Sequence, residues 1–155
     1  MFKILTIHDK QSELFLRKKT NSVSDPKMVT RSFINEMKKT MIGANGIGLA
    51  ANQIGNNTRI FVATHAGKFY VFINPILLKS STEEDTMEEG CLSVPNVYGA
   101  VTRASKVVIQ GIDVRGKLVK LKAVGLLARI FQHELDHLNG TLFIDKASET
   151  YSVED

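Results

Sequence analysis

The sequence contains one cysteine, no long apolar run and no cluster of like charges, and each of these absences narrows the possibilities. A single cysteine cannot form an internal disulfide, which excludes the disulfide-stapled scaffolds of small secreted proteins. No apolar stretch approaches the ~20 residues that a membrane-spanning helix needs. The first residues also lack the long apolar core and cleavage site of a signal peptide. We therefore expect a cytosolic protein, or one of the equivalent compartment of an organelle.

The charge is mild and scattered. The net charge is +4, and lysines and arginines gather only in short runs at 17–19 and 38–39. Proteins that bind nucleic acid usually concentrate these residues in one patch or stripe. We interpret them as part of a solvated, slightly basic surface, and we expect neither a specific nucleic-acid partner nor a membrane partner.

Length and composition suit a single folded unit. The chain has 155 residues, of which 43% are hydrophobic and 23% are charged, as in ordinary soluble domains. It contains no internal repeat, low-complexity stretch or linker. We therefore predict one catalytic domain that spans residues 1–155.

Two segments have the apolar periodicity of helices. In the first, apolar residues recur every four positions, which predicts a helix that is capped by Ser24 or Asp25 and ends near Gly43. The second helix is predicted over residues 125–138. Apolar side chains cover most of its circumference, which is typical of a buried central helix.

Runs of β-branched and aromatic residues between these helices predict strands. We expect one pair of strands at 59–64 and 69–73, and a hairpin of strands at 105–113 and 117–123. Strands and helices are segregated along the chain rather than alternating. The predicted fold class is therefore α+β, with mostly antiparallel β-sheets packed around a central C-terminal helix, plus an N-terminal helix.

The predicted C-terminal helix carries the HExxH motif His133-Glu134-Leu135-Asp136-His137. Because residues four apart lie on one face of a helix, both imidazoles can bind the same metal ion. Glu134 can then accept a proton from a water molecule that the ion activates. The ordinary alternative to a metal site is that both histidines lie on the surface of an exposed helix. On a buried helix, however, these polar groups need a partner, and a cation would be one.

The residues alone leave the third metal ligand open. A catalytic ion usually has three protein ligands and one open position, and the motif supplies two. His8 and His65 lie in segments where surface histidines are common. Cys91 follows Gly90, which allows close approach of the backbone, and a thiolate is a strong ligand for Zn²⁺ or Fe²⁺. Taken by itself, however, a lone cysteine is more typical of an apolar core.

Three separated motifs together resemble the signatures of the peptide deformylase family. They are GIGLAANQ at 46–53, EGCLS at 89–93 and QHELDH at 132–137, in the family's order and spacing. The resemblance extends from about residue 3 to residue 145. HExxH alone is shared with many zinc peptidases, whereas the three motifs together are highly specific.

The resemblance implies a reaction and a set of reacting groups. Members of the family hydrolyse the N-formyl group of N-formylmethionine on newly made polypeptides and release formate. Glu134 would take a proton from water on the metal and deliver it to the leaving amine. The side-chain amide of Gln53 and the N–H of Leu92 would stabilise the oxyanion. The ion would be Fe²⁺, which Zn²⁺, Ni²⁺ or Co²⁺ can replace. Its ligands would be Cys91, His133 and His137.

The resemblance also implies a pocket for the methionine side chain and a groove for the peptide that follows it. For the apolar members of this set, ordinary core packing is the alternative interpretation. A buried ion pair between Glu89 and Arg103 would support the site. The substrate-binding residues would be Ile47, Gly48, Met87, Gly90, Tyr98, Leu126 and Ile130.

Two features depart from the family pattern. Asn52 stands where proline often precedes the oxyanion donor, and this change removes no reacting group. Residues 147–155 are short and acidic, whereas many bacterial members continue into a basic helix that docks on the ribosome. We therefore expect a disordered tail, and the ribosome is a candidate partner for which the usual docking helix is lacking here. A compact member of this kind would suit a reduced genome, such as that of a virus of bacteria.

The motif has two alternative interpretations: a zinc peptidase, and a non-enzyme with either a structural metal site or an inactive one. Zinc peptidases with HExxH usually take a glutamate or histidine downstream of the helix as third ligand, but little of the sequence follows His137 and Glu149 lies in the acidic tail. A structural zinc site needs four protein ligands, and we find three. A catalytically inactive relative should have lost Glu134 or Gln53, and both are present. The sequence therefore favours a peptide deformylase.

Overall fold

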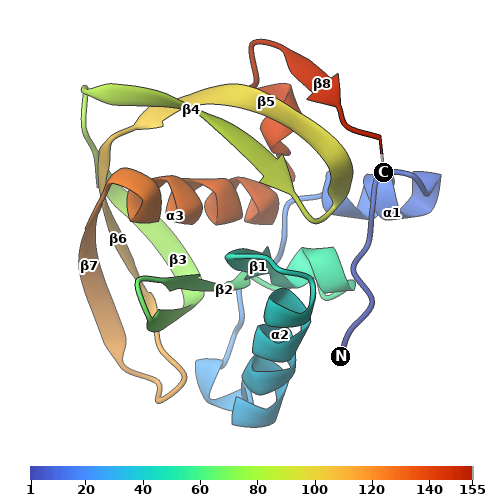
Figure 1. Cartoon of the computed structure of the whole chain (residues 1–155). Helices are drawn as coiled ribbons and strands as arrows, with labels where there is room; N and C mark the ends of the chain where they lie inside the picture. The colour runs from blue at the N-terminus through green and yellow to red at the C-terminus, as the bar shows by residue number, and fades with distance from the viewer. Residues whose placement is uncertain (155) are drawn as a thin grey trace.

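The computed structural model describes residues 1–154 and places the C-terminal helix α3, Gly125–Leu138, between two antiparallel sheets (Figure 1). One sheet has five strands in the order β1-β2-β3-β6-β7. The other has three strands in the order β4-β5-β8. This arrangement confirms the predicted α+β fold with antiparallel sheets around a central helix.

The five-stranded sheet contains both pairs of strands predicted from the sequence. The turn between β2 and β3 has positive φ at Ala66 and Gly67, as a tight hairpin requires. Strands β6 and β7 pair without interruption from Lys106 to Ile112. β3 is longer than predicted and has bulges beyond Ile73. The bounds are β1 Gly48–Ala50, β2 Ile60–His65, β3 Lys68–Ser80, β6 Lys106–Ile112 and β7 Leu118–Val124.

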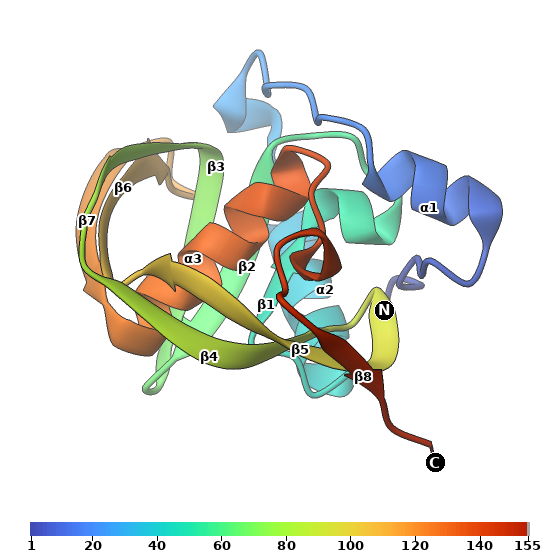
Figure 2. The ribbon, with the colours of Figure 1, turned by 90° about the horizontal axis from the view of Figure 1, so that it is seen from above.

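The three-stranded sheet was not predicted. It consists of β4 Glu84–Cys91, β5 Val94–Ala104 and β8 Thr150–Ser152. β4 is rich in charged residues and mostly exposed, so it lacks the alternation that marks a half-buried strand. The expectation of a disordered tail is wrong, because β8 pairs with β5 (Figure 2) and Val153 N–H donates to the Asn96 carbonyl at 2.7 Å.

The N-terminal helix begins later than predicted. Pro26 opens a separate 3₁₀ turn, Pro26–Met28, which Asp25 caps, and Val29 then has extended backbone. Helix α2, Arg31–Gly43, is capped by Thr30, whose hydroxyl accepts from the N–H of Phe33 at 3.1 Å.

The remaining helical segments are short. Helix α1, Lys10–Leu16, was not predicted, and the 3₁₀ turns η2, Ala51–Ile54, and η3, Phe143–Asp145, flank the central region of the fold. Among residues 1–154, no helix has both the length and the apolar character needed to cross a membrane.

Aromatic packing fixes α3 against the five-stranded sheet. The ring of Phe131 lies 5.8 Å from that of Phe61, 5.2 Å from that of Phe72 and 5.4 Å from that of Tyr70, measured between centroids. Phe61, Phe72 and Phe131 are almost fully buried in the main apolar cluster. Fully burying side chains of this size stabilises the fold by roughly 1.5–3 kcal/mol each. The opposite side of α3 faces β4 and β5, and its chemistry is different.

Candidate metal centre

Three side chains of the kinds that bind transition metals meet beside α3. Cys91 lies at the end of β4, and His133 and His137 lie one turn apart on α3. One potential ligand atom from each falls within 4.8 Å of the others, and Cys91 Sγ is 3.2 Å from His137 Nε2. A thiolate with two imidazoles suits Zn²⁺ or Fe²⁺, and three ligands leave one position open for chemistry.

His133 is oriented by a hydrogen bond as metal-binding histidines usually are, whereas His137 has no such bond among residues 1–154. His133 Nδ1 lies 2.8 Å from Glu89 Oε1, so Nε2 remains to face the cluster. Metal-binding histidines usually make such a bond with the nitrogen that does not bind the ion. For His137 it is Nε2 that faces Cys91, while Nδ1 is buried and has no hydrogen-bond partner among residues 1–154.

The charges around the cluster favour a cation there. Burial lowers the pKa of His133, but hydrogen bonds with Cys91 and Glu89 and the charge of Glu134 outweigh it and raise this pKa well above its ordinary value. Burial lowers the pKa of His137 well below its ordinary value. A lowered pKa favours the neutral imidazole of His137, which is the form that binds a metal ion. The donor set and its electrostatics fit such an ion.

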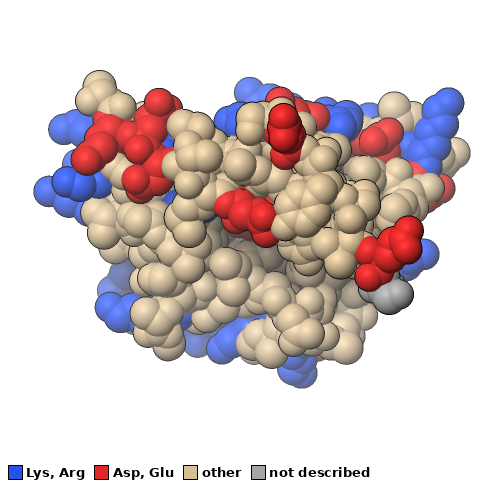
Figure 3. All heavy atoms as spheres, turned by 45° about the horizontal axis from the view of Figure 1, so that its top comes forward, with Lys and Arg blue, Asp and Glu red and all other residues tan. Residues whose placement is uncertain are grey.

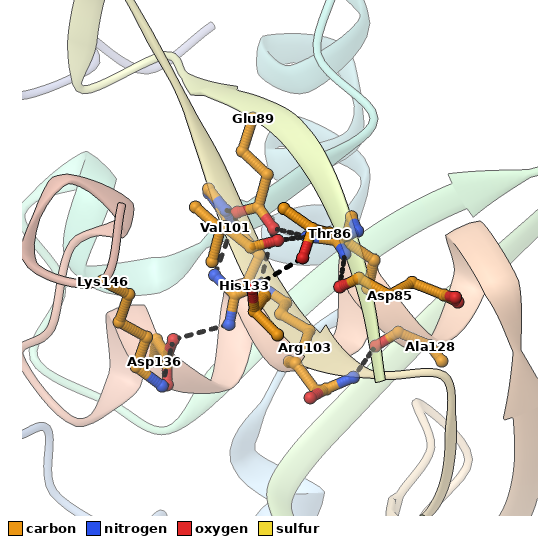
Figure 4. Close-up of polar contacts among 12 residues, drawn as sticks. Asp85, Thr86, Glu89, Val101, Arg103, Ala128, His133, Asp136 and Lys146 are labelled. Carbon is orange, nitrogen blue, oxygen red and sulfur yellow. Dashed lines mark hydrogen bonds and ion pairs between the residues drawn. The ribbon is translucent and has the colours of Figure 1, made fainter. Parts of the chain in front are cut away.

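A buried carboxylate, that of Glu89, holds His133 in place (Figure 4). Glu89 accepts two hydrogen bonds from Arg103, at 2.6 and 2.9 Å, and one from Arg129 at 2.5 Å. Burial alone would raise the pKa of Glu89, but the bonds from His133 and Arg103 and the charge of Arg103 lower it well below its usual range. Glu89 is therefore ionised at neutral pH. The predicted ion pair between Glu89 and Arg103 is confirmed.

Arg129 is a site residue that sequence reasoning missed. Its guanidinium also donates to the carbonyls of Val101 and Asp85, both at 2.8 Å, and so joins α3 to both β4 and β5. The signal was available, because an arginine inside an apolar stretch of a predicted buried helix needs buried acceptors. Asp136 was also missed: it accepts from Arg103 at 2.8 Å and extends the network to Lys146 (Figure 4).

Glu134 lies next to the cluster with its carboxylate held in a confined space. The residue is 3% exposed, and its Oε1 has no hydrogen-bond partner among residues 1–154. Burial raises the pKa of Glu134 to about 7, although the charges of His133 and Arg103 oppose this shift. A β-carbon at Gly48 would collide with Glu134 Oε2, so glycine leaves room for the carboxylate. A carboxyl group with this pKa can both accept and return a proton near neutrality.

The side-chain amide of Gln53 is oriented toward Cys91. Its Oε1 accepts the N–H of Ala50 at 2.9 Å, which turns Nε2 toward Ser93 Oγ at 3.0 Å and Cys91 Sγ at 3.7 Å. Ser93, which sequence reasoning did not single out, thus helps to hold the amide. Leu92 lies beside Cys91 in the turn between β4 and β5 and lines the same cleft.

Asn52 fills the position where proline was expected, and it has a structural role. It is fully buried, and its Nδ2 donates to the carbonyl of His137 at 2.6 Å. This bond ties the segment that carries Gln53 to the helix that carries the histidines. Proline has no side-chain donor and could not make this contact, although Asn52 Oδ1 is buried without a hydrogen-bond partner among residues 1–154.

A cleft of about 550 Å³ opens beside the cluster, and Figure 3 shows it as a hollow bordered by uncharged atoms and an acidic group. The structure does not place Met87 on its wall. Met87 is 46% exposed and lies opposite Val101 in the β4–β5 pair. The part of β4 that lines the cleft begins one residue later, at Glu88. The other predicted substrate-binding residues do line it, namely Ile47, Gly48, Gly90, Tyr98, Leu126 and Ile130.

Comparison with known proteins agrees with this geometry. The family model described as polypeptide deformylase matches residues 1–152. A peptide deformylase from Halothermothrix orenii is 50% identical over 133 residues, which cover 84% of this chain and 86% of the relative.

Solved structures agree as well. The crystal structure of peptide deformylase from Thermotoga maritima is 36% identical with a TM-score of 0.89, over 96% of this chain and 99% of that one. A probable peptide deformylase from Synechococcus phage S-SSM7 is 38% identical with a TM-score of 0.85, over 94% and 99% of the two chains.

Proposed function

The chain belongs to the polypeptide deformylase family, and we propose that it removes the formyl group from N-formylmethionine at the start of new polypeptides. The observation that carries this proposal is the cluster of Cys91, His133 and His137 at the head of a cleft, with Glu134 beside it. The reaction would take place in a bacterial-type cytosol, where formylated chains are made.

Cys91, His133 and His137 would hold the ion, which we propose is Fe²⁺, with Zn²⁺, Ni²⁺ or Co²⁺ able to replace it. The sulfur and nitrogen donors support this choice over Mg²⁺ or Ca²⁺, which prefer oxygen ligands. When bound, the ion supplies Lewis-acid chemistry, which polarises a carbonyl and lowers the pKa of water. Glu89 would keep His133 in its ligating orientation through the 2.8 Å bond.

Proton transfer would be the task of Glu134. Its carboxylate takes a proton from the water that attacks the formyl carbon, and it returns that proton to the methionine nitrogen as the carbon–nitrogen bond breaks. The products are formate and a free amino terminus. The pKa of about 7 supports both steps near neutrality.

The oxyanion that develops on the formyl oxygen needs donors already in place. Gln53 Nε2 is aimed at the cluster by the Ala50 N–H, and the N–H of Leu92 lies in the turn beside Cys91. Donors of this kind are worth about 3–4 kcal/mol each in the transition state. We therefore assign oxyanion stabilisation to Gln53 and Leu92.

Apolar side chains at the cleft suit a methionine side chain. Leu126 and Ile130 reach it from α3, and Ile47 reaches it from the segment before β1. Gly48 and Gly90 also line the cleft and would let the substrate backbone approach closely. These residues would select methionine by shape and apolarity, while the reacting groups act on the formyl end.

The test is formate release from an N-formyl-Met peptide by protein prepared anaerobically with Fe²⁺, beside its Glu134→Gln variant. We expect turnover by the parent and a loss of about 10²–10⁴-fold in the variant, because the proton acceptor is removed. Glu84→Gln, an exposed change on β4, is the matched control and should keep full activity. No formate release by the iron-loaded parent, combined with cleavage of unblocked peptides, would instead support the metallopeptidase alternative.

A further inference from the structure

The C-terminal strand β8 lies beside the cleft because it pairs with β5, which has a glycine where the two strands approach closely. Tyr151 is directly opposite Tyr98 in the antiparallel pair, and Ser148 N–H donates to the Ala100 carbonyl at 3.1 Å. A β-carbon at Gly99 would lie 2.6 Å from the Glu149 carbonyl oxygen, so a larger residue there would push the tail away. Figure 2 shows β8 beside β5, at the side of the molecule away from β7.

Tyr151 contacts two residues that line the cleft. Its ring lies 5.9 Å from the ring of Tyr98, between centroids, at an interplanar angle of 33°. Its hydroxyl donates to Glu88 Oε2 at 2.6 Å. Both Tyr98 and Glu88 line the cleft, whereas Tyr151 does not. A hydrogen bond to a carboxylate is stronger than one between neutral groups, so this bond can hold Glu88 in one rotamer.

Tyr98 is in turn packed against the residue that precedes Cys91. A β-carbon at Gly90 would lie 2.7 Å from Tyr98 Cε1, so the ring of Tyr98 rests directly on the Gly90 backbone. Gly90 and Tyr98 therefore form a continuous wall, and Tyr151 supports that wall from outside. Without Tyr151, the ring of Tyr98 and the carboxylate of Glu88 would regain rotamer freedom, which ligand binding would have to remove.

We propose that Tyr151 is a positioning residue that fixes Tyr98 and Glu88 at the rim of the cleft and so sets the affinity for the peptide chain that follows the formylmethionine. This inference rests on the proposed function. Tyr151 acts only through Tyr98 and Glu88, away from the reacting groups. It therefore controls binding of longer substrates and leaves the chemical step unchanged.

The experiment compares N-formylmethionine with an N-formylmethionyl tripeptide as substrates for the parent, Tyr151→Ala and Tyr151→Phe. For Tyr151→Ala we expect KM for the tripeptide to rise about two- to tenfold, the range for losing one fixed polar contact, with kcat unchanged. KM for N-formylmethionine should stay the same. Tyr151→Phe keeps the ring contact, so its KM for the tripeptide should lie between those of the parent and Tyr151→Ala. Ser152→Ala is the control on the same strand and should match the parent.

A second variant tests the same inference without touching Tyr151. Gly99→Val should displace β8 through the collision with Glu149 and should raise the tripeptide KM as Tyr151→Ala does. Equal KM values for all variants would overturn the inference, and so would a fall in kcat shared by both substrates, which would indicate a general structural role. Absence of formate release by the parent would overturn the proposed function instead, so the two failures are distinguishable.

Discussion

The two sides of α3 are held in place by different physical interactions. Toward the five-stranded sheet, the helix buries Ala128, Phe131 and Leu135 in an apolar cluster. Toward β4 and β5, it buries Arg129 against Glu89, a carboxylate that also holds His133. Apolar packing tolerates small shifts, whereas a buried charge must keep its partner. The comparison indicates that one side supplies stability and the other sets the geometry of the metal ligands.

The largest loss of activity should come from displacing the Glu134 carboxylate without mutating Glu134 itself. Gly48→Ala puts a β-carbon where Glu134 Oε2 lies. We expect kcat/KM to fall by about 10²–10⁴-fold, as for loss of a general base. Formate release measures this. Gly43→Ala is the matched control, because its β-carbon meets only the flexible end of Met1 and should leave activity unchanged.

Removing Glu89 should lower both the stability of the fold and its affinity for the metal ion. Glu89→Ala leaves Arg129 buried without a carboxylate partner and leaves Arg103 with Asp136 alone. We expect the free energy of unfolding to fall by about 3–5 kcal/mol. The affinity for Fe²⁺ or Zn²⁺ should fall by roughly 10–100-fold, because His133 loses its orienting bond. Urea unfolding and metal titration give the two values, and an unchanged metal affinity would contradict the assigned role.

Phe131→Ala should distinguish the role of the apolar side of α3 from that of the side that carries the metal ligands. It removes the ring that contacts Phe61, Phe72 and Tyr70, so we expect a loss of about 3–5 kcal/mol in the free energy of unfolding. Metal affinity per folded molecule should change little, because the ligands lie on the other side. If stability and metal affinity fell together, as for Glu89→Ala, the division between the two sides would be wrong.

The smallest loss of stability should come from removing an ion pair that is about as short as the Arg103–Glu89 pair but is not buried. Arg17 and Asp145 are 2.8 Å apart, with side chains 36% and 35% exposed. Arg103 and Glu89 are 2.6 Å apart and almost fully buried. We expect Arg17→Met to cost less than about 1 kcal/mol in urea unfolding. A cost as large as that of Glu89→Ala would show that burial does not decide the strength of these pairs.

The features that could be predicted from the sequence depend on local patterns. The α3 helix follows from its apolar coverage, and the β2–β3 and β6–β7 hairpins follow from strand runs separated by glycine turns. The spacing within HExxH places His133 and His137 one turn apart in any helix. The family resemblance added Cys91, which the structure brings within 3.2 Å of His137.

The features that could not be predicted depend on partners distant in the sequence. β8 has three residues and forms only because Gly99 leaves room for it on β5. β4 is a charged strand whose order comes from pairing with β5. Helix α2 starts at Arg31 rather than near Pro26, because Val29 is extended and Thr30 offers the cap. For β4 and β8 a tertiary contact, rather than local propensity, decides the structure, whereas for α2 the local cap at Thr30 decides it.

The most direct test of the account is the metal content of three proteins after anaerobic loading with Fe²⁺ and extensive dialysis: the parent, Glu134→Gln and Cys91→Ser. We expect one retained ion per chain in the parent and in Glu134→Gln, which keeps all three ligands but loses turnover. We expect Cys91→Ser to lose its ion. Full retention of the ion by Cys91→Ser, with activity intact, would contradict the assignment of Cys91, His133 and His137 as the metal centre.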